Sequence, residues 1–193
     1  MIKINIKKFD FVLCIIFISY LTLLFNIEKC YSQENKDKFY WLNFGIGSVP
    51  NTFEIGRGLA GGLIPCYQIG SNLFSFRYLG AVELYMEGPI PNEYIKEISL
   101  LYGKSIMKTK DYFCSASIGV GIIMGVKRGR FLGEPHVESY NYERLTFKKI
   151  SIPLEIQLFI TSPYTGMGFY LFANVNREIS YSGFLFCFLV GKL

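Results

Sequence analysis

The chain has 193 residues, with 20 lysines and arginines against 15 acidic residues, and a formal net charge of +5 at pH 7. Its basic residues are scattered rather than grouped, which excludes the concentrated positive patch of a nucleic-acid-binding protein. A single histidine makes a histidine-rich metal site implausible.

The N-terminal segment has the layout of a secretory signal peptide. A lysine-rich start precedes an apolar run from Phe11 to Phe25, and small residues favour cleavage after Ser32. A retained membrane anchor is less favoured, because the run is shorter than the roughly 20 residues that a spanning helix needs. We therefore expect a signal peptide at 1–32, a linker at 33–38 and a single β-barrel domain at 39–193.

After the linker, apolar and polar residues alternate in segments that we interpret as strands. In chain order these are 39–47, 58–70, 73–85, 94–104, 112–126, 148–160, 168–175 and 180–193. The clearest is 148–160, where every even position from 150 to 160 is Ile or Leu, so one face of the strand is continuously apolar. Long connections at 48–57, 86–93 and 127–145 alternate with short turns, which is typical of transmembrane barrels with long outer loops.

These features predict an all-β fold: an eight-stranded, antiparallel, up-and-down transmembrane β-barrel. Small and polar residues on the second face of each strand suit a narrow, packed lumen without a large pore. Aromatic residues near the strand ends, Tyr170 among them, suit the girdles of a membrane barrel. Pro65 and Pro153 lie inside predicted strands, and we expect a bulge at each, because proline cannot donate a ladder hydrogen bond.

Three stretches resemble a family of small outer-membrane β-barrels that is common in the Bacteroidota. They are Ile152–Phe159, Gly168–Asn176 and the terminal Gly191–Leu193, together with Ser32-Gln33 at the cleavage point. The resemblance implies an eight-stranded barrel in the outer membrane of a Gram-negative cell. Its expected partners are membrane lipid, lipopolysaccharide and the barrel-assembly machinery, with an extracellular partner that the sequence does not identify.

Two groups of charged residues are candidates for a functional role. Polar faces of the predicted strands carry Arg77, Glu83, Glu97 and Glu155, and we expect these to form an ion-pair network in the lumen, because an unpaired buried charge is costly. Lys127, Arg128 and Arg130 open the longest predicted loop and could contact lipopolysaccharide phosphates. The predicted strand cysteines, Cys66, Cys114 and Cys187, are interpreted as small apolar residues, and a disulfide between two of them stays open.

We therefore expect a structural role or interactions through the loops, without catalysis and without a cofactor. One alternative is a soluble periplasmic or secreted ligand-binding barrel, similar to a lipocalin, since alternation alone does not say which face points outward. A less favoured alternative is a lipid A-modifying enzyme that uses His136. That histidine stands beside Glu134, Glu138 and Ser139, but adjacent loop residues rarely converge as a catalytic base and nucleophile must.

Overall fold

The computed structural model describes residues 38–50, 52–53, 57–84, 91–109, 111–132, 142–177 and 179–192. The predicted signal peptide and residues 33–37 of the predicted linker lie outside these ranges. Lys38, expected to end the linker, is instead the first residue of a strand. Within the described part of the chain, no helix is long and apolar enough to cross a bilayer.

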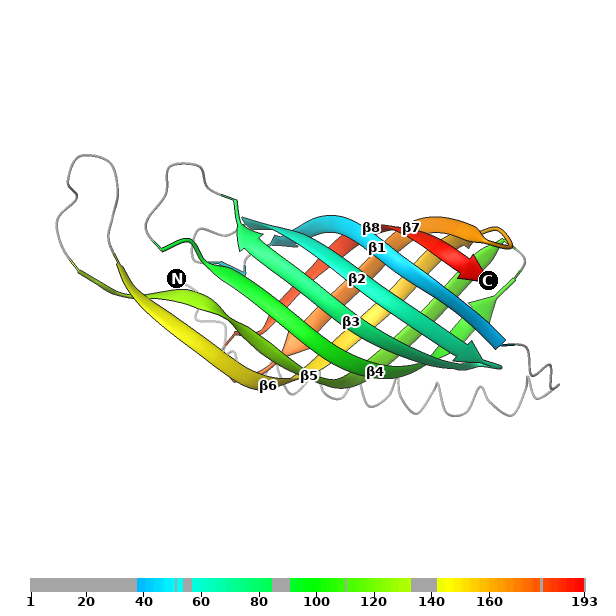
Figure 1. The fold of residues 1–193 in the computed structure, drawn as a ribbon, viewed down its shortest axis with the longest axis horizontal. Coiled ribbons are helices and arrows are strands. Elements are labelled where there is room, and N and C mark those ends of the chain that lie inside the picture. Colours follow the sequence, from blue (N-terminus) through cyan, green and yellow to red (C-terminus); the bar gives the residue numbers. More distant parts are fainter. Residues whose placement is uncertain are drawn as a thin grey trace, which may run out of the picture. The chain divides into compact units, whose positions relative to one another are not determined.

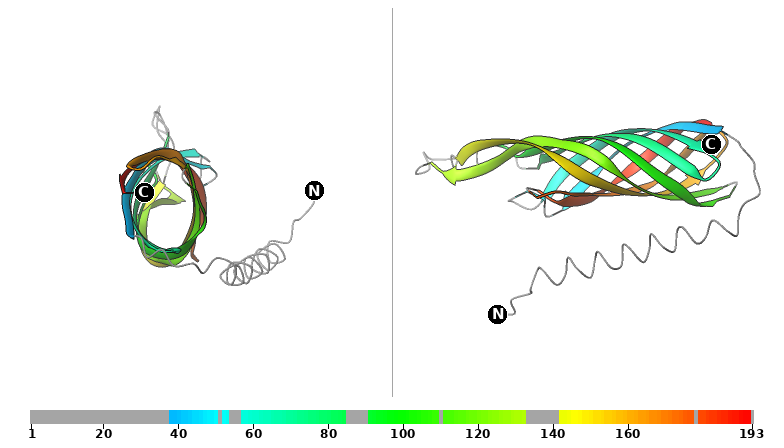
Figure 2. Two further views of the ribbon diagram at one scale, coloured as in Figure 1. Left: turned by 90° about the vertical axis from the view of Figure 1, so that its right-hand side faces the viewer. Right: turned by 90° about the horizontal axis from the view of Figure 1, so that it is seen from below.

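Eight strands form a closed barrel in sequence order (Figures 1 and 2). They are β1 (Lys38–Pro50), β2 (Arg57–Ile69), β3 (Asn72–Glu83), β4 (Tyr94–Lys108), β5 (Tyr112–Phe131), β6 (Tyr142–Thr161), β7 (Thr165–Val175) and β8 (Tyr181–Lys192). Every neighbouring pair is antiparallel, and β8 returns to pair with β1, so no strand edge is left open. The predicted fold class is confirmed.

The β5–β6 connection differs from the prediction, because residues 127–131 and 142–145 of the expected loop at 127–145 are strand. β5 and β6 have 20 residues each, and their ladder continues past Lys127–Leu145 to the pair of Phe131 with Tyr142. The rings of Phe131 and Tyr142 lie 5.4 Å apart and pack edge to face. The strands of the resulting β5–β6 hairpin project beyond the other strands at what we define as the outer end of the barrel (Figure 2).

The expected bulges at the two prolines are wrong. The β2–β3 register has the same offset on both sides of Pro65, and the β5–β6 register has the same offset on both sides of Pro153. The ladder is interrupted on one side of each proline only, since Pro65 still lies opposite Leu42 in β1 and Pro153 lies opposite Asn174 in β7. Neighbouring strands of a closed barrel therefore hold the register, and the register shifts lie elsewhere, at Ser105/Met107 and Arg128/Phe131.

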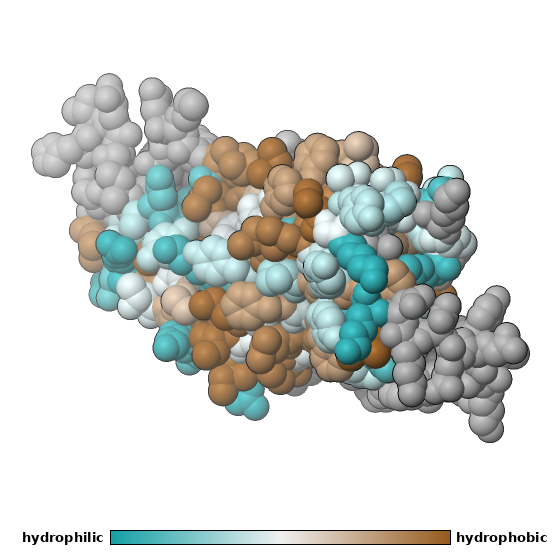
Figure 3. All heavy atoms as spheres, turned by 45° about the vertical axis from the view of Figure 1, so that its right-hand side comes forward, coloured by the Kyte–Doolittle hydropathy of each residue, from teal (hydrophilic) through white to brown (hydrophobic). Residues whose placement is uncertain are grey.

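The apolar faces of the strands point outward. On β6 the outward-facing side chains from Ile150 to Ile160 are all Ile or Leu, and Ile150 is 80% exposed. The residues between them are buried in the lumen. Ten residues at about 3.4 Å each, tilted by about 40°, give a height of about 26 Å, which matches the roughly 25 Å apolar band of membrane barrels. Hydrophobic residues gather across the middle of the surface in Figure 3, with hydrophilic residues towards its ends. The soluble alternative with inward apolar faces is therefore wrong.

Candidate functional site

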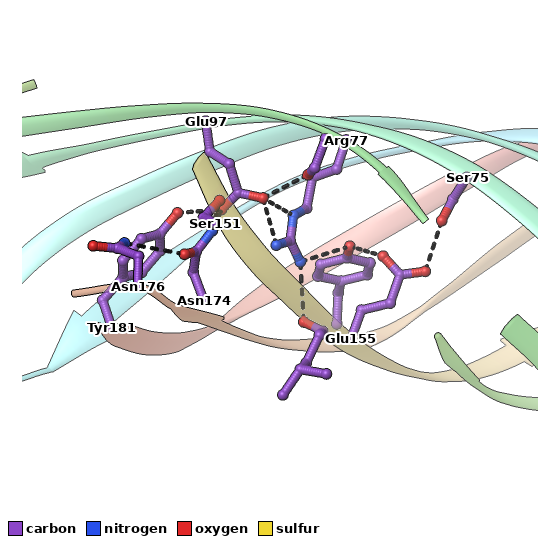
Figure 4. Close-up of polar contacts among 11 residues, drawn as sticks. Ser75, Arg77, Glu97, Ser151, Glu155, Asn174, Asn176 and Tyr181 are labelled. Carbon is purple, nitrogen blue, oxygen red and sulfur yellow. Dashed lines mark hydrogen bonds and ion pairs between the residues drawn. The ribbon is translucent and has the colours of Figure 1, made fainter. Parts of the chain in front are cut away.

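Arg77 of β3 lies fully buried in the middle of the lumen. Its Nε and Nη2 atoms donate to Oε1 of Glu97 in the adjacent strand β4, at 2.9 and 2.5 Å (Figure 4). Its Nη1 atom donates to the Leu154 carbonyl oxygen at 3.1 Å and to the Tyr170 hydroxyl at 3.4 Å. The guanidinium thus pairs with one carboxylate and reaches across the lumen to β6 and β7.

Glu155 of β6 joins the same network through Tyr170 rather than through a direct ion pair with Arg77. The Tyr170 hydroxyl donates to Oε2 of Glu155. Oε1 accepts hydrogen bonds from Ser75 Oγ at 2.8 Å and from Gln157 Nε2 at 3.0 Å. Neutral donors therefore surround this second carboxylate, which is the arrangement that a buried charge requires.

Glu97 also accepts hydrogen bonds from three neutral side chains. Ser99 Oγ donates at 2.5 Å, Asn174 Nδ2 donates at 2.8 Å, and the Tyr181 hydroxyl is a third donor. These residues belong to β4, β7 and β8, so the network connects five strands of the barrel once β3 and β6 are included. We call Arg77, Glu97, Glu155, Tyr170 and Tyr181 the lumen network.

An aromatic layer fills the lumen on the inner side of this network. Trp41, Phe113 and Phe159 are each at most 4% exposed. Trp41 and Phe113 pack edge to face with 5.2 Å between ring centroids, and Phe113 stacks on Phe159 at 6.4 Å. The interior is therefore filled by side chains, as the narrow lumen of an eight-stranded barrel predicts.

The structure places Arg77, Glu97 and Glu155 together, as predicted, but it places Glu83 elsewhere. Glu83 is the last residue of β3, at the outer end, where it forms a two-pronged ion pair with Arg128 of β5. Arg128 Nη1 lies 2.7 Å from Oε2 of Glu83, and Nη2 lies 2.6 Å from Oε1. Both side chains are buried.

Glu93, just before β4, completes this second cluster. Its Oε1 atom accepts a hydrogen bond from the Arg128 backbone N–H at 2.9 Å, and its own N–H donates to Oε2 of Glu83 at 3.2 Å. We call Glu83, Glu93 and Arg128 the mouth clamp, because it connects β3, the residue before β4 and the base of the β5–β6 hairpin. Its geometry follows from the hairpin: Arg128 lies within a strand, at a position that a loop would not fix.

The mouth clamp corrects the predicted phosphate contact of Lys127, Arg128 and Arg130. Arg128 is directed to Glu83 and is buried, so it is not part of an outer anion site. Lys127 is half-buried and Arg130 is exposed. Lys127 lines a cavity of about 260 Å³ at the outer end, to which β4, β5 and the connections β1–β2, β3–β4 and β7–β8 contribute. The lining residues are Thr52, Phe53, Glu93, Ile95, Val126, Lys127, Arg128 and Ile179.

Sequence reasoning missed Glu93, Asn174 and Tyr181, and it placed Tyr170 wrongly. Tyr170 was expected in a membrane girdle but is fully buried in the lumen. On β7 the lipid-facing Phe169 and Leu171 alternate with Tyr170 and Phe172, so both faces carry large apolar or aromatic residues. That sequence pattern gives no signal for which face points inward.

The remaining candidate residues have no assigned chemistry in the described part of the chain. His136, Glu134, Glu138 and Ser139 lie outside the described residues. Cys66 and Cys187 are buried, Cys114 is half-buried, and all three are free thiols. Among the residues that the structure describes, no group of three or more His, Cys, Asp or Glu side chains is placed to hold a metal ion.

No protein-family model and no curated protein matches the chain. Several solved structures do match. Neisserial surface protein A matches with a TM-score of 0.60 and 11% identity, over 81% of this chain and 99% of the other. The attachment invasion locus protein Ail of Yersinia pestis matches with a TM-score of 0.57 and 8% identity, over 82% of this chain and all of the other (100%). Ail in a phospholipid bilayer nanodisc matches with a TM-score of 0.51 and 9% identity, over 80% and 99%. At these identities the likeness concerns the fold, and this chain has the fold of the small eight-stranded outer-membrane β-barrels.

Proposed function

We propose that the protein is a non-conducting outer-membrane barrel that acts through its outer end, by binding lipid headgroups or an extracellular partner. The observation that carries this proposal is the contrast between a filled lumen and a projecting β5–β6 hairpin. The lumen network and the aromatic layer occupy the space that a pore would need. The hairpin instead places side chains beyond the apolar belt, where they can meet ligands.

The charge of the hairpin supports an anionic ligand. Its exposed basic side chains are Arg130, Arg144, Lys148 and Lys149, and Glu143 is the exposed acid among its described residues. The connection at 133–141 adds Glu134 and Glu138 in the sequence. Positive charge is therefore concentrated on the part of the hairpin nearer the barrel, where phosphates of lipid headgroups would lie.

Three finer expectations belong to the same proposal. A cleaved signal peptide would export the chain, and the barrel-assembly machinery would insert it. The resemblance to barrels of the Bacteroidota supports kinship with that family. These expectations agree with a membrane barrel fold, which needs both export and assisted insertion.

The first test combines membrane isolation with electrophoresis and conductance. We expect the protein in the outer-membrane fraction, with a gel band that shifts on boiling, because a closed barrel resists unfolding in detergent. In planar bilayers we expect no discrete conductance steps, since side chains fill the lumen. A soluble protein without a gel shift would contradict the membrane barrel, and stable conductance steps would contradict the non-conducting role.

We also propose that the role is not enzymatic. Support comes from the ionisable groups of the lumen network, which are engaged with one another and with neutral donors. Replacing His136 by Ala should leave the mass spectrum of lipid A from expressing cells unchanged, as should Ser139→Ala. A lipid A species that appears with the natural chain and disappears in either variant would contradict this proposal and support a lipid-modifying enzyme.

A further inference from the structure

Two lysines lie in one row on the outside of the barrel. Lys96 of β4 is paired with Met124 of β5, and Met124 is paired with Lys148 of β6. Both lysines are exposed and alternate with lumen-facing residues, so they share the lipid-facing side of the wall. They are two strand spacings apart, or about 10 Å, so both long side chains can approach one group above Met124.

This row marks the outer edge of the apolar belt. Directly below it lies a row of three isoleucines, Ile98, Ile122 and Ile150, connected by the same ladders. Lys148 is the next lipid-facing residue after Ile150 on β6. The Lys96 ammonium lies 5.7 Å from the ring centroid of Tyr94, which holds it at the interface.

An apolar groove of about 720 Å³ lies on the wall further from the outer end. Two rows of lipid-facing side chains border it, and each row contains one residue from each of the strands β2, β3, β4 and β5. The upper row is Pro65, Phe76, Leu100 and Val120, and the lower row is Tyr67, Phe74, Tyr102 and Ile118. Phe74 and Tyr102 pack at 5.3 Å between ring centroids, and the Tyr102 hydroxyl donates to Asn72.

The groove lies where an acyl chain from the lysine row would run. Leu100 and Tyr102 are four and six residues along β4 from Lys96, or about 10 Å and 16 Å deeper for tilted strands. One leaflet of the hydrocarbon core is about 15 Å thick, so Leu100 lies within the leaflet that the lysines border and Tyr102 lies near the middle of the bilayer. Because the strands are tilted, a line along the barrel axis from the outer end of β4 crosses β3 and then β2 (Figure 1).

From this placement we infer a lipid-binding site for a phosphorylated glycolipid of the outer leaflet. Lys96 and Lys148 bind a headgroup phosphate above Met124, and an acyl chain of the same lipid lies in the groove on β2–β5. Lysine suits a phosphate as a compact point charge. The site is local, since the lipid-facing positions of β7 from Met167 to Val175 carry no charge. It rests on the proposed membrane function and identifies the class of lipid that this wall binds.

The test is a lipid titration of the refolded mature barrel in detergent, followed by native mass spectrometry. The probes are bis-phosphorylated lipid A, the same glycolipid without phosphates, and phosphatidylglycerol. For the double variant Lys96→Gln/Lys148→Gln we expect about 30-fold weaker binding of lipid A, and about fivefold weaker binding for each single variant. Val120→Phe, which fills part of the groove without changing the charge, should weaken binding several-fold.

Lys104→Gln is the matched control, because Lys104 lies on the same side of β4 at the inner end of the belt. We expect it to bind lipid A as the natural chain does. Equal losses in Lys104→Gln and in the double variant would overturn the site, as would equally tight binding of the dephosphorylated glycolipid or of phosphatidylglycerol. A heat-induced gel shift of every variant confirms that it is folded. Absence of that shift in the natural chain would instead contradict the proposed membrane function.

Discussion

The lumen network and the mouth clamp are built from the same parts, and they have different consequences. Each combines one arginine with two glutamates: Arg77 with Glu97 and Glu155, and Arg128 with Glu83 and Glu93. In the lumen network, Arg77 pairs directly with Glu97 and reaches Glu155 only through Tyr170. In the mouth clamp, Arg128 contacts both carboxylates itself.

The surroundings of the two clusters explain this difference. Within the membrane zone, Glu97 and Glu155 accept hydrogen bonds from tyrosine, serine and amide side chains, because no bulk water is available to them there. At the outer end, backbone N–H groups take over part of that role, with Arg128 donating to Glu93 and Glu93 donating to Glu83. The lumen network therefore connects the wall around its circumference, whereas the mouth clamp positions one hairpin.

The largest expected effect is that of Arg77→Met, which leaves Glu97 without its cation inside the barrel. We expect a loss of about 3–5 kcal/mol in the free energy of unfolding, as for other buried pairs that lose one partner. Urea unfolding in micelles, followed by the fluorescence of the single tryptophan, Trp41, measures this loss. The double variant Arg77→Met/Glu97→Gln should recover part of it, because it also removes the unpaired charge. A loss below about 1 kcal/mol for Arg77→Met would contradict the network.

Much of the barrel could be predicted because a lipid environment imposes a strict pattern. Wherever one face of a strand meets lipid and the other meets the lumen, residues alternate, as they do from Ile150 to Ile160. The pairing of Arg77 with Glu97 could be predicted for the same reason, because both residues lie on the polar faces of two consecutive antiparallel strands. The expected positions of all eight strands overlap those in the structure.

The prediction failed where that constraint ends. Beyond the belt, both faces of the β5–β6 hairpin can contact water, so residues 127–131 and 142–147 show no apolar alternation and resemble a loop. Without the hairpin, Arg128 could not be placed beside Glu83, and Glu83 was assigned to the wrong cluster. The site on the outer wall needed strand register as well, because only the ladders place Lys96 and Lys148 in one row.

Arg128→Met should have a smaller and more local effect than Arg77→Met. It removes the ion pair with Glu83, but the freed carboxylates lie at the outer end, where water can reach them after a small movement. We expect a loss of about 2 kcal/mol in the free energy of unfolding, typical of hydrogen bonds to a charged group. The ladder between β5 and β6 does not depend on Arg128, so the barrel itself should stay closed.

The local effect of Arg128→Met should appear in limited proteolysis of the barrel in detergent, read by mass spectrometry of the fragments. Cleavage within the β5–β6 hairpin should become several-fold faster, because the hairpin loses its attachment to β3 and to Glu93. Arg130→Gln is the matched control, since Arg130 is exposed on the same strand, two residues away. Equal cleavage rates in the two variants would mean that the ladder alone positions the hairpin. In that case the two clusters would differ in kind, with only the lumen network stabilising the structure.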